Sequence, residues 1–250
     1  GLLRRLQATA DMTGRATMIA GYAGPKPKQI AAENIDRVRA VLAIKDLQER
    51  IPVLAESAEE VAAAYTEAHG FALVRAAEVE LVKRIQDRIT AGLVKGIARD
   101  KTIDLIRKDG DFSRGYAQLV YDTNVATAYS AGRFREGELM KKQGLFVALR
   151  YRTSGRATTT DAHGHYLAGV RPMHRLMHGT IASIDDPIWN HASPPIDFSC
   201  QCSISPIDRV DIPKELFLSD GTLRRARLPE GFKASAGFGS RPDRAIYGAA

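Results

Sequence analysis

Four side chains able to bind a soft metal ion lie close together in the second half of the sequence. His174 and His178 are four residues apart, and Cys200 and Cys202 follow after a loop. Helical spacing of four places both imidazoles on one face, and alternation along a strand places both thiols on one face. Zn²⁺ accepts four such nitrogen and sulfur ligands in a tetrahedral site. The pattern therefore allows a structural zinc clip that is closed by four protein ligands.

Other interpretations of these residues stay open. Paired cysteines in common structural zinc sites have two intervening residues, and here there is one. The cysteines could be buried apolar side chains, with the histidines hydrogen-bonded to loop carbonyls. Asp186 or His191 could replace one of the ligands. A disulfide between neighbours this close is strained, and the absence of further cysteines fits assembly in a reducing compartment.

An enzymatic interpretation rests on the clustering of Asp161, His163 and His165 with His174 and His178, because metal-dependent hydrolases and nucleases use such side chains. The sequence contains no HExxH, no Gly-x-Ser-x-Gly, no phosphate-binding glycine loop and no dinucleotide-binding fingerprint. We therefore expect no enzyme, with a metal-dependent hydrolase as the less favoured alternative.

The formal net charge of +7 permits a polyanionic partner. Basic residues outnumber the single acid, Asp161, between Lys141 and His178. The candidates for contact with nucleic acid or an acidic partner are Arg150, Arg152, Arg156, Arg171 and Arg175. A solvated basic face is the alternative explanation of the same pattern.

The first half of the chain is expected to be helical. Residues 1–27 are punctuated by Gly14, Gly21 and Gly24 and end in Pro25-Lys26-Pro27, which predicts an extended arm. Over residues 28–112, apolar side chains recur at three- and four-residue spacing, which is typical of packed helices. The predicted helices run from Lys28 to Ile51-Pro52, from Ser57 to about Gly70 with Glu60 completing the cap, and from Phe71 to Lys108.

The second half mixes helix and strand, so the predicted fold class is α+β. Ser113 can cap a long helix that ends near Gly144. Further along, we expect a strand over 146–153, a short helix over 171–178, a loop over 181–195, a strand over 200–205 ended by Pro206, and a loosely structured extension over 207–250.

Several residues in this half are expected to serve as scaffold. Asp185, Asp186 and Pro187 form a turn-making sequence, since aspartate side chains bond the following backbone. Trp189, the only tryptophan, can anchor the long loop on the core. Thr123, Asn124 and Arg133 on the long helix are expected to bond adjacent loops.

Separated blocks of the sequence resemble the phage Mu F-like head-morphogenesis family in order and spacing. The blocks are Tyr121–Arg133, Tyr151–Ser154, Val170–Gly179, Asp185–Trp189 and Pro194–Cys202. Ile196-Asp197 departs from the Asn-Gly turn more usual in the family, and the loop around His163 looks elaborated. The resemblance covers residues 113–206 and defines a small, loop-rich α+β domain after the helical region.

The resemblance implies a minor head (capsid) protein of a tailed bacteriophage, with His174, His178, Cys200 and Cys202 on recurring family positions. It further implies a virion component at the portal vertex or inner head surface, assembled in the host cytoplasm and needed for head morphogenesis. The implied partners are the portal protein, the major capsid protein and packaged DNA, and the alternative is a DNA-binding packaging or ejection protein. No membrane partner is expected, because no run of 18 apolar residues occurs.

Overall fold

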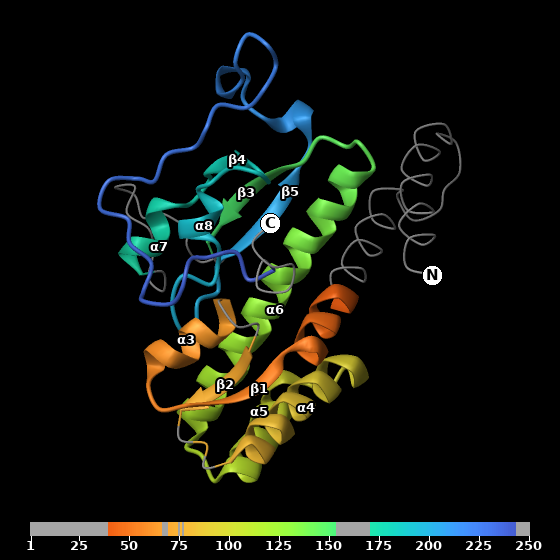
Figure 1. Cartoon of the computed structure of the whole chain (residues 1–250), viewed down its shortest axis with the longest axis vertical. Coiled ribbons are helices and arrows are strands. Elements are labelled where there is room, and N and C mark those ends of the chain that lie inside the picture. Colours follow the sequence, from red (N-terminus) through yellow and green to blue (C-terminus); the bar gives the residue numbers. More distant parts are fainter. Residues whose placement is uncertain (1–39, 67–69, 75, 77, 154–170, 244–250) are drawn as a thin grey trace, which may run out of the picture.

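A long helix connects two parts of the protein. The computed structural model describes residues 40–66, 70–74, 76, 78–153 and 171–243 (Figure 1). The long helix, α6, spans Arg114–Lys142. A two-stranded sheet and several helices pack along its first half, and a three-stranded sheet with two short helices packs along its second half (Figure 1). The predicted α+β fold class is confirmed.

The first part begins with a helix over residues 40–49 and continues into a strand–helix–strand unit. Strand β1 (Ile51–Ala55) leads through α3 (Ala58–Thr66) to β2 (Gly70–Val74), and the two strands pair in parallel. Ser57 caps α3 as predicted, because its hydroxyl accepts a hydrogen bond from the Glu60 backbone N–H at 3.1 Å. The Glu60 carboxylate in turn accepts one from the Glu56 N–H at 2.8 Å.

The two strands correct the purely helical prediction for this half. One predicted helix ended at Ile51-Pro52 and another began at Phe71, but residues 51–55 and 70–74 form strands. Phe71, Ala72 and Leu73 of β2 are buried. A short strand buried on both faces shows no alternation of polar and apolar residues, so its periodicity does not separate it from a buried helix.

Three helices complete the first part. Helix α4 (Val79–Lys95) packs on α5 (Arg99–Gly110) and on the two strands, and α5 packs on α6. Ser113 caps α6 as predicted, accepting from the Tyr116 N–H at 3.3 Å. None of the described helices is both long and apolar enough to cross a membrane. We call the following buried residues the helical core: Ala43, Leu47, Phe71, Leu73, Val82, Ile85, Ile89, Ile103, Ile106, Ala117, Val120, Tyr121 and Ala128.

The second part is an antiparallel sheet in the order β4-β3-β5. Its strands are β3 (Ala148–Arg152), β4 (Ile181–Ser183) and β5 (Ser203–Ile207), and its helices are α7 (Pro172–Leu176) and α8 (Trp189–Ala192). We call the following buried residues the sheet core: Phe134, Val147, Leu149, Tyr151, Met177, Ala182, Ile184, Ile188, Trp189, Ala192, Ile196, Cys200, Cys202 and Ile204. Helix α6 contributes Phe134 to this core and Val120 to the helical core. The division of the chain at residue 113 therefore stays a prediction.

Two expectations for this part were wrong in detail. The region 181–195 was expected to be a loop, but it contains β4 and α8. The strand expected over 200–205 instead covers Ser203–Ile207, so both cysteines precede it and Pro206 lies within it. Proline is tolerated there because β5 is an edge strand, whose outer side needs no backbone N–H.

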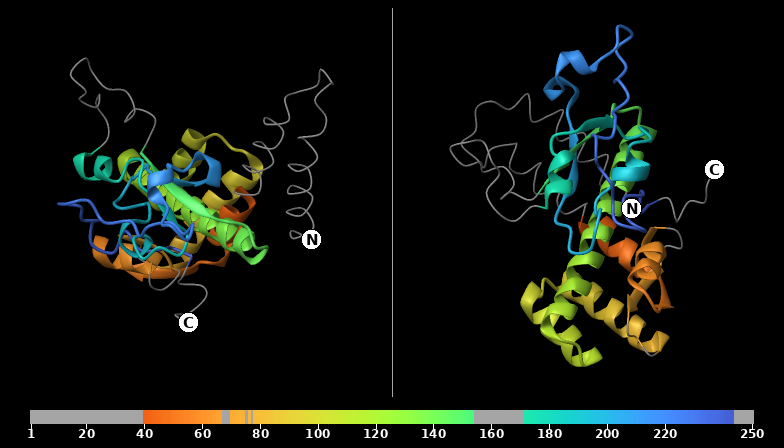
Figure 2. Two further views of the ribbon diagram at one scale, coloured as in Figure 1. Left: turned by 90° about the horizontal axis from the view of Figure 1, so that it is seen from above. Right: turned by 90° about the vertical axis from the view of Figure 1, so that its left-hand side faces the viewer.

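The C-terminal segment consists mainly of extended chain with two short 3-10 helices, η2 (Arg209–Asp211) and η3 (Lys214–Leu216). It extends beyond the end of α6 and then returns along the molecule (Figure 2). On its return, the Arg241 guanidinium binds the Glu138 carboxylate of α6 at 2.9 Å and the Ile184 carbonyl at 3.1 Å. Phe238, which precedes Arg241 in the chain, packs with Val61 and Ala72 of the first part. The C-terminal segment therefore contacts both parts of the protein.

Several predicted features fall outside the described residues. They are the arm over 1–27, the first part of the helix predicted from Lys28, and the loop that contains Arg156, Asp161, His163 and His165.

Candidate metal centre

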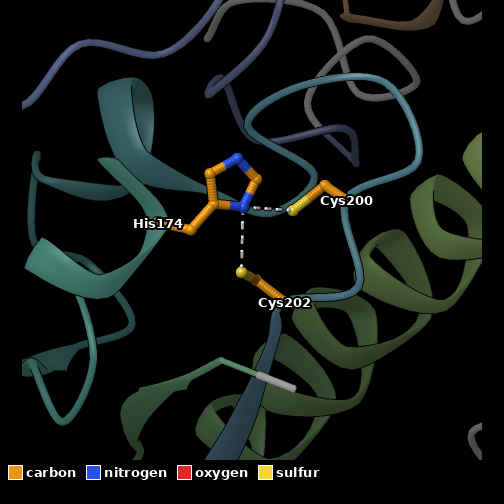
Figure 3. A group of neighbouring side chains, drawn as sticks. All are labelled: His174, Cys200 and Cys202. Atoms are coloured by element: carbon orange, nitrogen blue, oxygen red, sulfur yellow. Dashed lines mark hydrogen bonds between the residues drawn. The ribbon is translucent and has the colours of Figure 1, made fainter. Parts of the chain in front are cut away.

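His174, Cys200 and Cys202 come together in one buried cluster (Figure 3). The Nδ1 atom of His174 lies 3.3 Å from Cys202 Sγ and 3.5 Å from Cys200 Sγ. The three side chains lie within 4.8 Å of one another at their ligand atoms, and each residue is at most 8% exposed. Figure 3 shows the imidazole and both sulfurs pointing toward a common centre.

The distances in this cluster fit a tetrahedral metal site. With a metal–nitrogen bond of about 2.05 Å and metal–sulfur bonds of about 2.3 Å, tetrahedral nitrogen and sulfur ligands lie about 3.6 Å apart. The two observed separations, 3.3 and 3.5 Å, are close to that value. His174, Cys200 and Cys202 could therefore hold a metal ion with small side-chain movements.

Helix α7 and the segment before β5 position the three ligands. Pro172 occupies the first turn of α7, where its missing N–H costs nothing, and His174 follows on the buried side. The Arg171 guanidinium, at the start of α7, binds the Asp197 carboxylate and donates to the Phe198 carbonyl at 2.7 Å. This pair of contacts ties the histidine helix to the loop that carries the cysteines.

The long helix holds the same loop from its other side. The Ser199 backbone N–H donates to the Thr123 hydroxyl of α6 at 3.0 Å. Ser199 has φ of 52°, a left-handed conformation that turns the chain immediately before Cys200. The Cys200 N–H donates to the Asp197 carbonyl at 3.2 Å. Backbone bonds to α6 and within the loop thus orient the cysteines before any metal binds.

The electrostatics of the cluster favour one thiolate. The pKa of the Cys200 thiol lies well below its ordinary value because hydrogen bonds from Cys202 and then His174 stabilise the thiolate, against the effect of burial. The pKa of Cys202 is raised, first by its hydrogen bond to Cys200 and then by burial. The pair therefore loses its first proton at Cys200, and this proton loss prepares one sulfur for a metal.

His178, the fourth expected ligand, is not part of the cluster. Its Nδ1 atom lies 2.8 Å from the Thr153 hydroxyl, at the end of β3. The expectation assumed one helix through both histidines, but α7 ends at Leu176. The imidazoles therefore do not share a helix face, and the expected set of four ligands is corrected to three.

The two alternative ligands also lie elsewhere. The Asp186 carboxylate accepts hydrogen bonds from the Ile188 N–H at 2.9 Å and the Ala226 N–H at 2.8 Å. His191 is exposed on α8 and is not a member of the buried cluster.

The expected scaffold residues lie around the sheet core. Trp189 is fully buried, contacts Phe134 edge-on, and donates from Nε1 to the Ser183 carbonyl at 2.8 Å. Asp186 and the following Pro187 form the turn before α8, and exposed Asp185 pairs with Lys141 at 2.6 Å. On α6, Asn124 is buried and donates to the Val120 carbonyl of its own helix at 2.8 Å, and Arg133 is half-buried.

The candidate basic contact residues are spread over two elements. Arg150 and Arg152 lie on β3, and Arg152 donates to the Ser205 hydroxyl at 2.9 Å. Arg171 binds the cysteine loop, and Arg175 is half-buried on α7. At least two of these arginines therefore make structural contacts within the chain.

Tyr151 lies beside the cluster, although it was expected only as part of a strand and of a block that carries the resemblance. Strand register places it opposite Ile204 and therefore near Cys202. The role of Arg171 in binding the cysteine loop was likewise not predicted.

Comparison with known families identifies the central part of the chain. Residues 83–167 match the family model described as Phage Mu protein F like protein. This segment of the chain is similar to the phage Mu F-like family. This family implies a role in phage head morphogenesis. No curated protein and no solved structure matches the chain.

The Mu F-like match covers about a third of the chain and runs from α4 through β3. It includes all of α6 and overlaps the resemblance seen in the sequence over residues 113–167. His174, Cys200 and Cys202 lie beyond its end. The metal cluster therefore rests on its own geometry and not on the family match.

Proposed function

We propose that this chain is a structural minor head protein of a tailed bacteriophage, located at the portal vertex or the inner surface of the head. The Mu F-like match over residues 83–167 is the observation that carries the proposal. In this role the chain binds the portal protein or the major capsid protein and acts as a structural part of the virion, not as an enzyme. The long helix α6 joins two cores, which suits a protein that holds other subunits in a fixed relation.

Location within the virion tests this role. The phage that encodes the chain should contain it in purified virions and procapsids, which mass spectrometry detects. Labelled antibodies should mark one vertex or the inner surface of opened heads. A chain that is absent from both particles, or spread evenly over the outer shell, would contradict the proposal.

The His174, Cys200 and Cys202 cluster is proposed to bind zinc as a structural clip. The ligand types suit Zn²⁺, and bound metal would link α7 to the approach of β5. Three protein ligands would leave the fourth position of a tetrahedral ion to water or to a group outside the cluster, so the proposed structural role no longer requires a site closed by four protein ligands. The ion would hold two short elements together, as structural zinc does in small domains.

Elemental analysis of the full chain, purified under reducing conditions, tests the clip. We expect one zinc per chain, lost in His174→Ala and retained in His178→Ala, the matched control from the same segment. Zinc affinity should rise with pH, because the Cys202 thiol, whose pKa is raised, must release its proton to the solvent. Wild-type protein without stoichiometric zinc, or equal loss in both histidine variants, would contradict the clip.

Packaged DNA is the second candidate partner, supported by the formal net charge of +7. Arg152 and Arg171 make contacts within the chain, which leaves fewer basic side chains to contact DNA. Retention of duplex DNA by the purified chain at moderate salt, lost on neutralising Arg150 and Arg152, would favour this alternative over a purely protein-binding role.

A further inference from the structure

Tyr151 carries a buried hydroxyl group without a hydrogen-bond partner among the described residues. The residue is fully buried in the sheet core. A buried polar group that has no partner destabilises the folded state, so such groups are rare and call for an explanation. Most of the phenol is apolar and packs well, but its O–H requires an acceptor.

Strand register places this hydroxyl at the metal cluster. Tyr151 on β3 lies opposite Ile204 on β5, and Cys202 comes two residues before Ile204. Residues two apart along an extended chain point to the same face, and diagonal neighbours lie within reach of an aromatic side chain. Tyr151, Cys200 and Cys202 all belong to the sheet core, so the phenol and both sulfurs are buried in the same cluster.

The backbone of Tyr151 also ties β3 to the segment after α7. Its N–H donates to the Thr180 carbonyl at 2.8 Å, and its carbonyl accepts from the Gly179 N–H at 3.0 Å. The residue therefore lies between the two chain segments that supply the ligands, and its ring position is fixed by both.

We propose that the Tyr151 hydroxyl donates a hydrogen bond to the Cys202 sulfur when that sulfur is a metal-bound thiolate. This inference rests on the proposed zinc clip and adds a positioning residue to it. A phenol keeps its proton at neutral pH, so its O–H can donate a hydrogen bond. A thiolate sulfur has no proton and can only accept one. Metal binding removes the Cys202 proton and directs His174 Nδ1 to the ion, which leaves the sulfur free to accept.

The consequence is a coupling between metal binding and the tyrosine. Without metal, the hydroxyl makes no well-formed hydrogen bond and lies beside the Cys202 thiol, a weak acceptor that is already within 3.3 Å of His174 Nδ1. With metal, the same hydroxyl satisfies its own donor and stabilises the charge on the ligand. Partners of this kind orient metal ligands, and their removal weakens metal binding by about 10- to 100-fold.

Tyr151→Phe in the full chain tests the inference, because it removes only the oxygen and keeps the ring. Zinc affinity, measured by competition with a chromophoric chelator, should fall by about 10- to 100-fold. The urea midpoint of the metal-free variant should equal or exceed that of the metal-free wild type, since an unpartnered buried hydroxyl is lost. Tyr121→Phe, which alters a buried tyrosine of the helical core, is the matched control and should leave zinc affinity unchanged.

A purely structural role for Tyr151 would give the opposite pair of results: lower stability of the metal-free variant with unchanged zinc affinity. Unchanged affinity overturns this inference and leaves the clip intact, whereas a wild-type chain that binds no zinc overturns the clip itself. If Tyr151→Phe does not fold, zinc titration of the wild type gives the second measurement. A red shift of tyrosine absorption on zinc binding supports the hydrogen bond, and no shift overturns it.

Discussion

The two cores of the protein are stabilised in different ways. The helical core is formed mainly by long helices, including α4 with 17 residues and α6 with 29. The sheet core is formed by strands of three to five residues and helices of four to five, together with part of α6. Elements this short are marginal by themselves, since an isolated helix or strand pair of that length is unstable in water.

Cross-links compensate for the short elements of the sheet core. The Trp189 ring, the Asp186 carboxylate and the Arg241 guanidinium each bond backbone groups of other segments. The histidine and cysteine cluster joins α7 to the approach of β5 in the same core. The difference indicates that helix packing maintains the first core, whereas single anchoring side chains maintain the second.

The largest expected effect comes from removing one such anchor. Trp189→Ala should lower the free energy of unfolding by about 3–5 kcal/mol, because it deletes a fully buried indole and leaves a cavity. Urea denaturation followed by far-UV circular dichroism measures the loss. His191→Ala, on the exposed side of the same short helix, should change stability by less than about 0.5 kcal/mol. Equal losses in both variants would show that the core does not depend on this anchor.

A second, smaller effect tests how closely the sheet core packs on α6. A Cβ atom added at Gly137 would meet the Ile184 Cδ1 atom. Gly137→Ala should therefore cost about 1–3 kcal/mol through overpacking, although alanine favours helix. Ile184→Val removes that Cδ1 atom, so the double variant should recover most of the loss. A double-mutant cycle in urea checks this, and additive losses would contradict the close contact.

The elements that could be predicted from sequence are helices long enough to show a repeated apolar spacing and helices that begin or end at a clear capping residue. Helix α6 has a capping serine at its start and Gly144, with φ of 76°, after its end, so both limits were predicted. Strand β2 was missed because its buried residues show no alternation, and β1 was missed because all five of its residues are apolar although Ile51 and Leu54 are exposed. Strand β4 and helix α8 were missed because tertiary contacts around Trp189 form them and local propensity does not.

The residues of the candidate site were likewise predictable only where local sequence determines their position. The residue types of His174, Cys200 and Cys202 indicated a soft metal, and the structure brings these three together. His178 was included because a spacing of four defines a helix face, but the helix ends two residues before it. The end of a five-residue helix depends on what it packs against, which a single sequence does not contain. Tyr151 enters the site only through strand pairing, which is also invisible at that stage.

The smallest expected effect on stability comes from the exposed contact that ties the cysteine loop to α7. Arg171→Gln removes an ion pair with Asp197 and a bond to the Phe198 carbonyl. Exposed ion pairs contribute at most about 1 kcal/mol, so the urea midpoint should move little. Zinc affinity should nevertheless fall, because the loop that carries Cys200 would lose part of its order before binding. Arg225→Gln, at an exposed position of the C-terminal segment, should change neither quantity. If Arg171→Gln lowered stability as much as Trp189→Ala, the buried anchors would not dominate the sheet core, and the contrast with the helical core would fail.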